Sequence, residues 1–368
     1  MSEIKLKQAR VAEFCGRYGL DGVLLTRRHN FAWATAGRDN RIPDNSDTGI
    51  AAVLMTPDSL TCLCNRIESP RMRDEELAGL QVPVVEFPWH DAAAGAKAVA
   101  EVIAGRKIAA DMPLAGLDLP VIPQDFAELR RSLTEPEVAR FVEGAQRTAD
   151  ALEASARAAE PGMTEFELAA STAAECYRRG VVPVVNLIAV DDRIDTFRHP
   201  IPTGRQLSKR AMLVICGWYG GLISNLTRFV HFGEPDAELL AKRQKVVDID
   251  AAVNLATRPG RTLGEIFADL QAAYAKAGFA DEWQNHHQGG MAGYLGREAF
   301  ADPGSSVVVP PDSAYAWNPS VPGFKSEDTY LCRGDGGYEC LTKCGADWPQ
   351  VTGESELGPL VRADILVK

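Results

Sequence analysis

Apolar and polar positions along the first part of the chain alternate between helical and strand-like periods. Residues 1–20 carry apolar side chains at helical spacing, and a second helical stretch runs from 92 to 105. Short apolar runs typical of buried strands lie between and after them, at 22–26, 50–55, 60–63 and 107–110. Helices that alternate with strands predict a small α/β domain over residues 1–130, which ends near the proline-marked segment 119–123.

Helical periodicity then dominates, and it begins at a clear start signal. Thr134 can cap a helix, Pro136 suits the first turn, and Glu137 stands three residues after the cap. An apolar stripe at helical spacing follows, made of Val138, Phe141, Val142, Ala145, Ala149 and Leu152. These features predict a long helix near the start of a second domain, residues 131–368.

A short pattern recurs within this second domain. The sequence PGMTEFE at 161–167 is echoed by PGRTLGE at 259–265, and a long helical stretch precedes each copy. In both copies a threonine is followed three residues later by a glutamate, which predicts a capping box at the start of a new helix. The matching context predicts a pair of pseudo-symmetric halves.

Composition limits the possible partners and location. The chain has 39 basic and 50 acidic residues, a net charge of −11, which argues against nucleic-acid and anionic-membrane partners. The charged N-terminus is unlike a signal peptide, and no apolar run is long enough to span a membrane. The eight cysteines show no zinc or disulfide spacing, so we expect reduced thiols in a cytoplasmic protein.

Six segments, in order, carry a family resemblance. They are residues 10–37, which end in NFAWATAG, then TEPEV at 134–138, PGMT at 161–164, RHPIPT at 198–203, SNLTR at 224–228 and SEDT at 326–329. Together they resemble the creatinase, prolidase and aminopeptidase P superfamily. The resemblance implies an α/β (α+β) fold, with a small creatinase-like N-terminal domain and a C-terminal pita-bread domain that contains an internal pseudo-two-fold repeat.

The same resemblance locates the family's metal ligands, which are two aspartates, a histidine and two glutamates. The corresponding positions here are Cys216, seventeen residues after His199, and then Asn225, His287, Asn318 and Glu327. Three acidic ligands are thus replaced by a cysteine and two asparagines, which cannot neutralise two divalent cations. We therefore expect no metal and no other cofactor.

The remaining polar pocket resembles that of creatinase, which uses this fold without metal. The resemblance implies that His199 is the general base or acid that activates water. Glu327, with His287, would orient the substrate nitrogen or carry the second proton. Asn225 and Asn318 would donate hydrogen bonds to a developing oxyanion.

Further residues are assigned to substrate binding. Cys216 lies in the pocket, and Arg198, Arg228 or Lys325 could clamp a substrate carboxylate. By the same resemblance the protein forms a homodimer in which Arg38 or Arg41 closes the partner's pocket. We expect the other histidines, at positions 29, 90, 231 and 286, to be surface or structural residues.

Three functional hypotheses follow. The first is a metal-independent hydrolase that cleaves a C–N bond in a small polar amide or amidine. The second is a hydrolase with one metal held by Cys216, His287 and Glu327, or an Xaa-Pro-type peptidase. The third is an inactive pita-bread protein that serves as a binding module.

Overall fold

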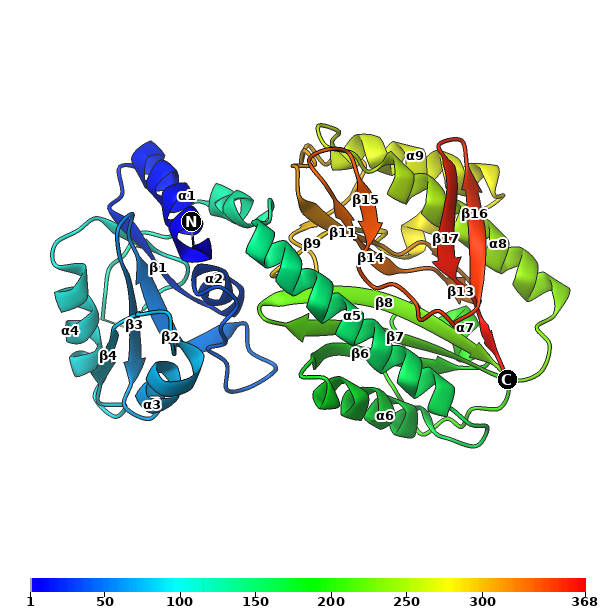
Figure 1. The fold of residues 1–368 in the computed structure, drawn as a ribbon, viewed down its shortest axis with the longest axis horizontal. Helices are drawn as coiled ribbons and strands as arrows, with labels where there is room; N and C mark the ends of the chain where they lie inside the picture. The colour runs from blue at the N-terminus through cyan, green and yellow to red at the C-terminus, as the bar shows by residue number, and fades with distance from the viewer. Residues whose placement is uncertain (1, 115) are drawn as a thin grey trace. The chain divides into compact units, whose positions relative to one another are not determined.

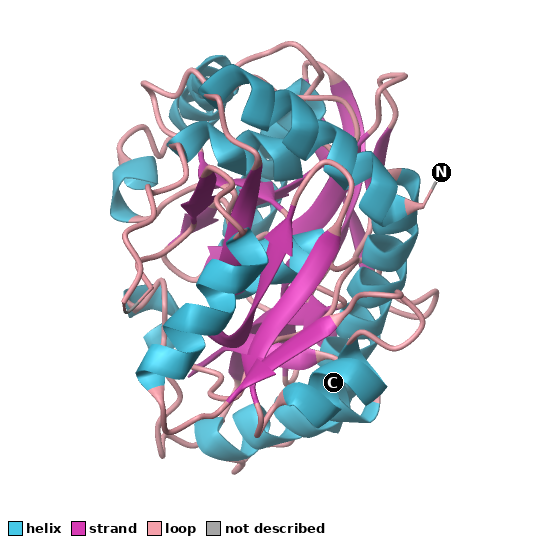
Figure 2. Cartoon of the chain, turned by 90° about the vertical axis from the view of Figure 1, so that its left-hand side faces the viewer, coloured by secondary structure: helices cyan, strands magenta, loops and turns pink. Residues whose placement is uncertain are grey.

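The computed structural model of the chain describes residues 2–114 and 116–368. Its contacts divide the chain into two compact units, Met1–Glu137 and Val138–Lys368. Helices and strands occur in both units, so the chain has the mixed α/β class that the sequence predicts (Figure 2). Among the described residues, no helix combines the length and the apolar character needed to cross a membrane.

The first unit is built on a mixed five-stranded sheet in the order β4-β3-β2-β1-β5 (Figure 1). The apolar side chains of the strands pack with helix α4 into a core that includes Leu24, Leu54 and Ile103. The elements are α1 (Glu3–Tyr18), β1 (Gly22–Arg27), α2 (Arg28–Ala34), β2 (Thr48–Met55), β3 (Leu60–Asn65), α3 (Ser69–Arg71), β4 (Val84–Phe87), α4 (Ala92–Ile103) and β5 (Ile108–Ala110). Each strand and helix expected here from the sequence is present.

A 3-10 helix, Gln124–Arg130, lies against α1 in the first unit. The rings of Phe14 and Phe126 meet edge to face at 5.2 Å, and Arg10 donates hydrogen bonds to the carbonyls of Leu129 and Ser132. This helix therefore belongs to the first compact unit, Met1–Glu137.

The second unit contains two similar halves, each with a helix pair beside strands (Figure 1). The first half has α5 (Glu135–Ala158), α6 (Glu165–Arg178), β6 (Val182–Val190), α7 (Arg193–Thr196), β7 (Arg210–Tyr219) and β8 (Leu222–His231). The second has α8 (Ala237–Ala256), α9 (Leu263–Lys276), β9 (Gly289–Ala292), β10 (Ala299–Phe300), β11 (Ser313–Trp317), β12 (Ser320–Val321), β13 (Phe324–Lys325), β14 (Asp328–Cys332) and β15 (Tyr338–Cys340). The chain ends with β16 (Gln350–Ser355), β17 (Gly358–Ala363) and β18 (Leu366–Val367).

The predicted repeat is present down to single hydrogen bonds. Thr164 and Thr262 each cap a helix in a complete capping box, with Glu167 and Glu265 as the reciprocal partners. The glycine of each Pro-Gly turn donates its N–H to a carbonyl in a following segment, at 2.7 Å in the first half and 3.0 Å in the second. The local signals therefore mark equivalent turns in the two halves.

The two caps give a matched test of this equivalence. Replacing Thr164 or Thr262 with alanine is expected to lower the free energy of unfolding by about 1 kcal/mol each, because the backbone N–H of Glu167 or Glu265 loses its hydroxyl acceptor. Thr164→Ser, which retains the hydroxyl, is the control and should stay near the parent value. Urea unfolding measures all three, and a cost in only one half would contradict the equivalence.

The sheet of the first half is buried on both faces, and successive side chains of its strands point alternately to one face and the other. Ala211, Leu213 and Ile215 pack with α5 and α6, whereas Met212 and Val214 pack with the helices and strands of the second half. The second face of this sheet is therefore directed at the second half of the unit.

Candidate active site

The site begins on the face of β7 and β8 that is directed at the second half. Cys216 continues the alternation of Met212 and Val214, and it lies directly opposite Asn225 in the antiparallel register. Thr227 lies two residues after Asn225 on the same face of β8. Two positions that correspond to family metal ligands are thus brought side by side by strand pairing.

The second half contributes β11 and β14. Trp317 pairs with Asp328, so the next positions outward, Asn318 and Glu327, lie opposite each other at the end of the ladder. The backbone N–H of Thr227 donates to the carbonyl of Glu327 at 3.0 Å, which joins this ladder to β8. The strand register therefore assembles four of the five predicted positions.

Glu327 is buried and held by cationic side chains. Its carboxylate accepts from Lys325 Nζ at 3.0 Å, from Arg297 Nη2 at 3.1 Å and from the Thr227 hydroxyl at 2.9 Å. Burial alone would raise the pKa of this carboxyl, but Lys325 and Arg297 outweigh burial and hold the pKa at about 2. Glu327 is therefore ionised at neutral pH.

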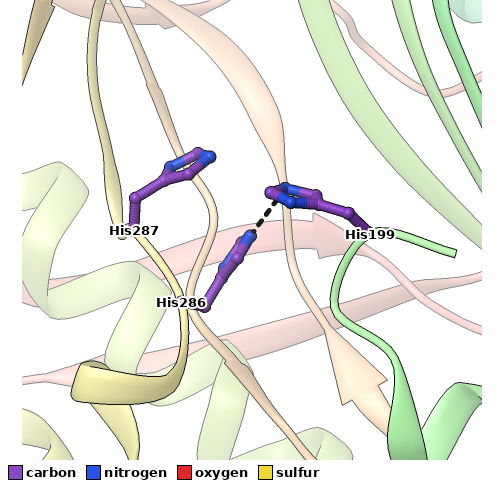
Figure 3. Close-up of side chains that lie close together, drawn as sticks. All are labelled: His199, His286 and His287. Carbon is purple, nitrogen blue, oxygen red and sulfur yellow. Dashed lines mark hydrogen bonds between the residues drawn. The ribbon is translucent and has the colours of Figure 1, made fainter.

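Three histidines converge in a cluster (Figure 3), and the charges of Lys325, Arg297 and Glu327 act on two of them, His199 and His287. His199 comes from the segment between α7 and β7, and His286 and His287 come from the segment that leads into β9. The Nε2 atoms of His199 and His286 are 3.1 Å apart, and the rings of His286 and His287 stack at 4.6 Å between centroids. The tertiary fold therefore joins two loops that are far apart in sequence.

His286 was expected to be a surface or structural residue, and it lies in this cluster and not at the surface. Its side chain is buried, at 8% exposure, and its ring contacts both other histidines. Local sequence patterns do not predict this contact, because the partner His199 is 87 residues away.

Burial favours the neutral form of these imidazoles, and so do the nearby cations. Loss of solvent lowers the pKa of His199 and His287, with Lys325 acting on the first and Arg297 on the second in the same direction. Burial, followed by Lys325, lowers the pKa of His286 more strongly. The cluster thus presents uncharged rings with available lone pairs at neutral pH.

Several buried polar atoms at the site lack a hydrogen-bond partner among the described residues. They are Asn225 Oδ1, Asn318 Oδ1 and Arg297 Nε. Buried polar groups are normally satisfied, so groups left open beside one another indicate that something else meets them. The two amide oxygens accept and the Arg297 Nε–H donates, so the set suits a ligand that carries both an N–H and an oxygen. In this arrangement the open asparagine atoms are acceptors, unlike the donors to an oxyanion that were predicted.

Two predicted carboxylate clamps have partners elsewhere. Arg228 is buried at 1% exposure, and it bonds Asp328 at 2.9 Å and Glu153 at 3.3 Å. Its assignment to substrate binding is wrong, because those carboxylates and two backbone carbonyls engage its guanidinium in the core. Arg198 forms an ion pair with Glu282, so it can bind a substrate only by exchanging that partner.

Cys216 and Arg41 lie in different surroundings. Burial, followed by the charge of Glu327, raises the pKa of the Cys216 thiol to about 12, so the sulfur is uncharged at neutral pH and lines the pocket.

Arg41 lies in the first unit, where it pairs with Asp39 and Asp44 at 3.0 Å each. Its reach into a partner's pocket stays a prediction.

Arg297 is the site residue that the sequence did not single out. It lies in the loop between β9 and β10, with 8% of its side chain exposed, and bonds Glu327. The loop is held near β8, since Gly293 accepts from the Ile223 N–H at 2.8 Å. The Gly296-Arg297-Glu298 sequence, a cation in a glycine-marked loop after a strand, was the available signal.

The family's two-metal centre does not fit these residues. Of its five positions only Glu327 carries a carboxylate, and both oxygens of that carboxylate already bond Lys325, Arg297 and Thr227. A pair of divalent cations needs several anionic oxygens and would be repelled by the two side-chain cations.

The predicted single-metal site of Cys216, His287 and Glu327 also needs correction. Among the described residues, the cluster of at least three potential metal ligands is His199, His286 and His287, with all ligand atoms within 4.8 Å of one another. Cys216 and Glu327 do not belong to this group.

The low pKa of Glu327 predicts a pH dependence of stability. Because the folded pKa of about 2 lies below the ordinary 4.5, the pair stabilises the fold fully above pH 4.5. That contribution is expected to disappear as the pH falls from 4.5 through 2. Urea unfolding across this range measures the loss, and Glu327→Gln should remove this part of the pH dependence while leaving that of the other carboxyls.

Comparisons with known proteins agree with this architecture. A family model described as metallopeptidase family M24 matches residues 139–333. The probable dipeptidase PepE of Mycobacterium tuberculosis is 24% identical over 340 residues, which cover 86% of this chain and 89% of that protein.

Solved structures show the same fold. The Xaa-Pro dipeptidase from Bacillus anthracis has a TM-score of 0.77 at 19% identity, over 99% of this chain and 100% of that chain. The N-terminal domain of FACT complex subunit SPT16 from chickpea has a TM-score of 0.69 at 12% identity, over 94% and 96%. The predicted pita-bread fold is confirmed, and because the family model covers more than half of the chain, this protein belongs to metallopeptidase family M24.

Proposed function

We propose that this chain is a hydrolase that cleaves a C–N bond in a small polar amide or amidine by acid–base catalysis, without the family's two-metal centre. The observation that carries the proposal is the environment of Glu327. This carboxylate corresponds to a metal ligand, yet Lys325 and Arg297 supply the positive charge around it. In this proposal the two side-chain cations supply the positive charge that metal ions supply in the family.

His199 is the general base in this proposal. Its ring is neutral at neutral pH, solvent reaches it, and its Nε2 faces that of His286. His199 takes a proton from water while the water oxygen bonds to the substrate carbon. The C–N bond then breaks, and the leaving nitrogen receives the proton, with His286 or His287 able to relay it.

The remaining residues bind the substrate. Glu327 stays ionised, so its role is to accept from a substrate N–H rather than to donate a proton. The open amide oxygens of Asn225 and Asn318 accept hydrogen bonds and the open Nε of Arg297 donates one, which supports a substrate with an N–H and an oxygen or a second nitrogen. Amides, amidines, ureas and guanidino compounds share this pattern.

The names of the relatives favour a second candidate, an Xaa-Pro-type or other dipeptidase. The compared proteins include a probable dipeptidase and an Xaa-Pro dipeptidase. The donor set described above weighs against this reading, since those carboxylate positions are Cys216, Asn225 and Asn318 here. The homodimer with Arg41 at the partner's site remains part of the first proposal.

One screen separates the two candidates. The full-length protein, dialysed against a chelator, is assayed for amine release from small amides, amidines and ureas, and from Xaa-Pro and other dipeptides, with and without Mn²⁺, Co²⁺ or Zn²⁺. We expect turnover of a small compound by the metal-free protein. Turnover of dipeptides alone, and only with added metal, would replace the first candidate with the second.

A further inference from the structure

We propose that His199, His286 and His287 bind a single transition-metal ion of the zinc class, with a ligand set different from that of the family's two-metal centre. Three imidazoles that leave one position open make up a known type of zinc site. Imidazole nitrogen also suits copper and nickel, so the chemical class is a borderline divalent ion.

The geometry of the cluster fits one ion. Zinc–nitrogen bonds of about 2.0–2.1 Å place two tetrahedral ligands about 3.3 Å apart. The facing Nε2 atoms of His199 and His286 are 3.1 Å apart, and the ligand atoms of all three rings lie within 4.8 Å. Figure 3 shows the His287 ring beside the other two rings.

The chemistry of the rings also fits. Two neutral imidazoles at this distance share one proton between their facing nitrogens, and a metal ion takes the place of that proton. His199 and His287 are exposed, so an ion can enter from solvent, while His286 is buried.

Packing fixes the rings before an ion binds. His287 stacks on His286 and meets the Phe300 ring edge to face at 5.1 Å. The nearby charges of Lys325 and Arg297 oppose a cation, but both side chains are paired with Glu327, which reduces their effect. His231 shows the contrast, because its Nδ1 bonds the Gly233 carbonyl at 2.7 Å and it lies outside the cluster.

The site has a consequence for catalysis that rests on the proposed function. An ion bound to His199 occupies the lone pair that would accept the proton from water. Metal binding would then inhibit the hydrolase, and removal of the ion would restore it.

The binding test needs no substrate. Full-length protein stripped of metal is titrated with Zn²⁺ by calorimetry and with Co²⁺ by visible absorption. We expect one ion per chain, with a tetrahedral cobalt spectrum that lacks a thiolate charge-transfer band. His199→Ala and His287→Ala alter exposed side chains and should each weaken binding more than ~100-fold, since loss of an outer partner already costs 10–100-fold.

Matched variants decide the ligand set. His90→Gln changes an exposed histidine of the first unit and should leave binding intact. Lack of stoichiometric binding, or full binding by both His199→Ala and His287→Ala, would overturn the proposal. Loss of binding in Cys216→Ser would also overturn it, in favour of a thiolate-containing site.

Activity measurements separate this inference from the proposed function. Inhibition by one equivalent of Zn²⁺, reversed by a chelator, supports both. Binding of one equivalent without inhibition, or with activation, supports the metal site and overturns the role of His199 as a metal-free base.

Discussion

Replacing Glu327 with glutamine is expected to lower the free energy of unfolding by about 3–5 kcal/mol. Glutamine keeps the shape of the side chain but removes the charge that Lys325 and Arg297 bond at 3.0 and 3.1 Å. Both cations are buried, so the variant leaves them without a countercharge in a region of low dielectric. Urea unfolding followed by tryptophan fluorescence measures the difference.

Two controls define the cause of this loss. Glu339→Gln breaks an exposed ion pair with Lys343 and should change stability by no more than about 0.5 kcal/mol. Combining Glu327→Gln with Lys325→Met removes one stranded charge and should recover part of the loss. A cost for Glu327→Gln as small as that of Glu339→Gln would show that the pair is not the electrostatic centre described here.

Replacing His199 with alanine is expected to lower kcat by ~10²–10⁴-fold on the substrate found in the screen. His199 is exposed in a loop, so the fold should keep its stability, and the loss should fall on kcat more than on KM. Steady-state kinetics of the chelator-treated protein measure the effect.

His90→Gln serves as the control for this variant, because His90 is exposed and lies in the first unit. It should keep the parent rate. A loss of less than ~10-fold in His199→Ala would assign the base elsewhere in the cluster, and His287→Ala is the next variant to assay.

The sequence shows which carboxylate positions of the family are replaced, but it does not show which cations then surround Glu327. Cys216, Asn225 and Asn318 stand at countable distances from recognisable motifs, so their positions followed from the alignment of short segments. Of the two cations that bond Glu327, the sequence predicted only one as a site residue. Lys325 is two residues from Glu327 and is part of the predicted pocket, whereas Arg297 is 30 residues away in another loop.

Arg228 shows the limit of reading a charged residue from its motif. It lies beside site residues in sequence, within SNLTR, and so was assigned to substrate binding. Because strand side chains alternate between faces, Arg228 is directed away from Asn225 and Thr227, toward Asp328 and Glu153. The packing of the sheet, and not the motif, decides which face of β8 is directed into the core and which into the site.

The sequence by itself determined the elements, the helix caps and the internal repeat. These depend on neighbours within a few residues, as in Thr164 with Glu167 and Thr262 with Glu265. Only the tertiary structure decided which distant side chains meet. His286 contacts His199 across 87 residues and Arg228 contacts Asp328 across 100, because sheet packing, and not local propensity, sets those distances.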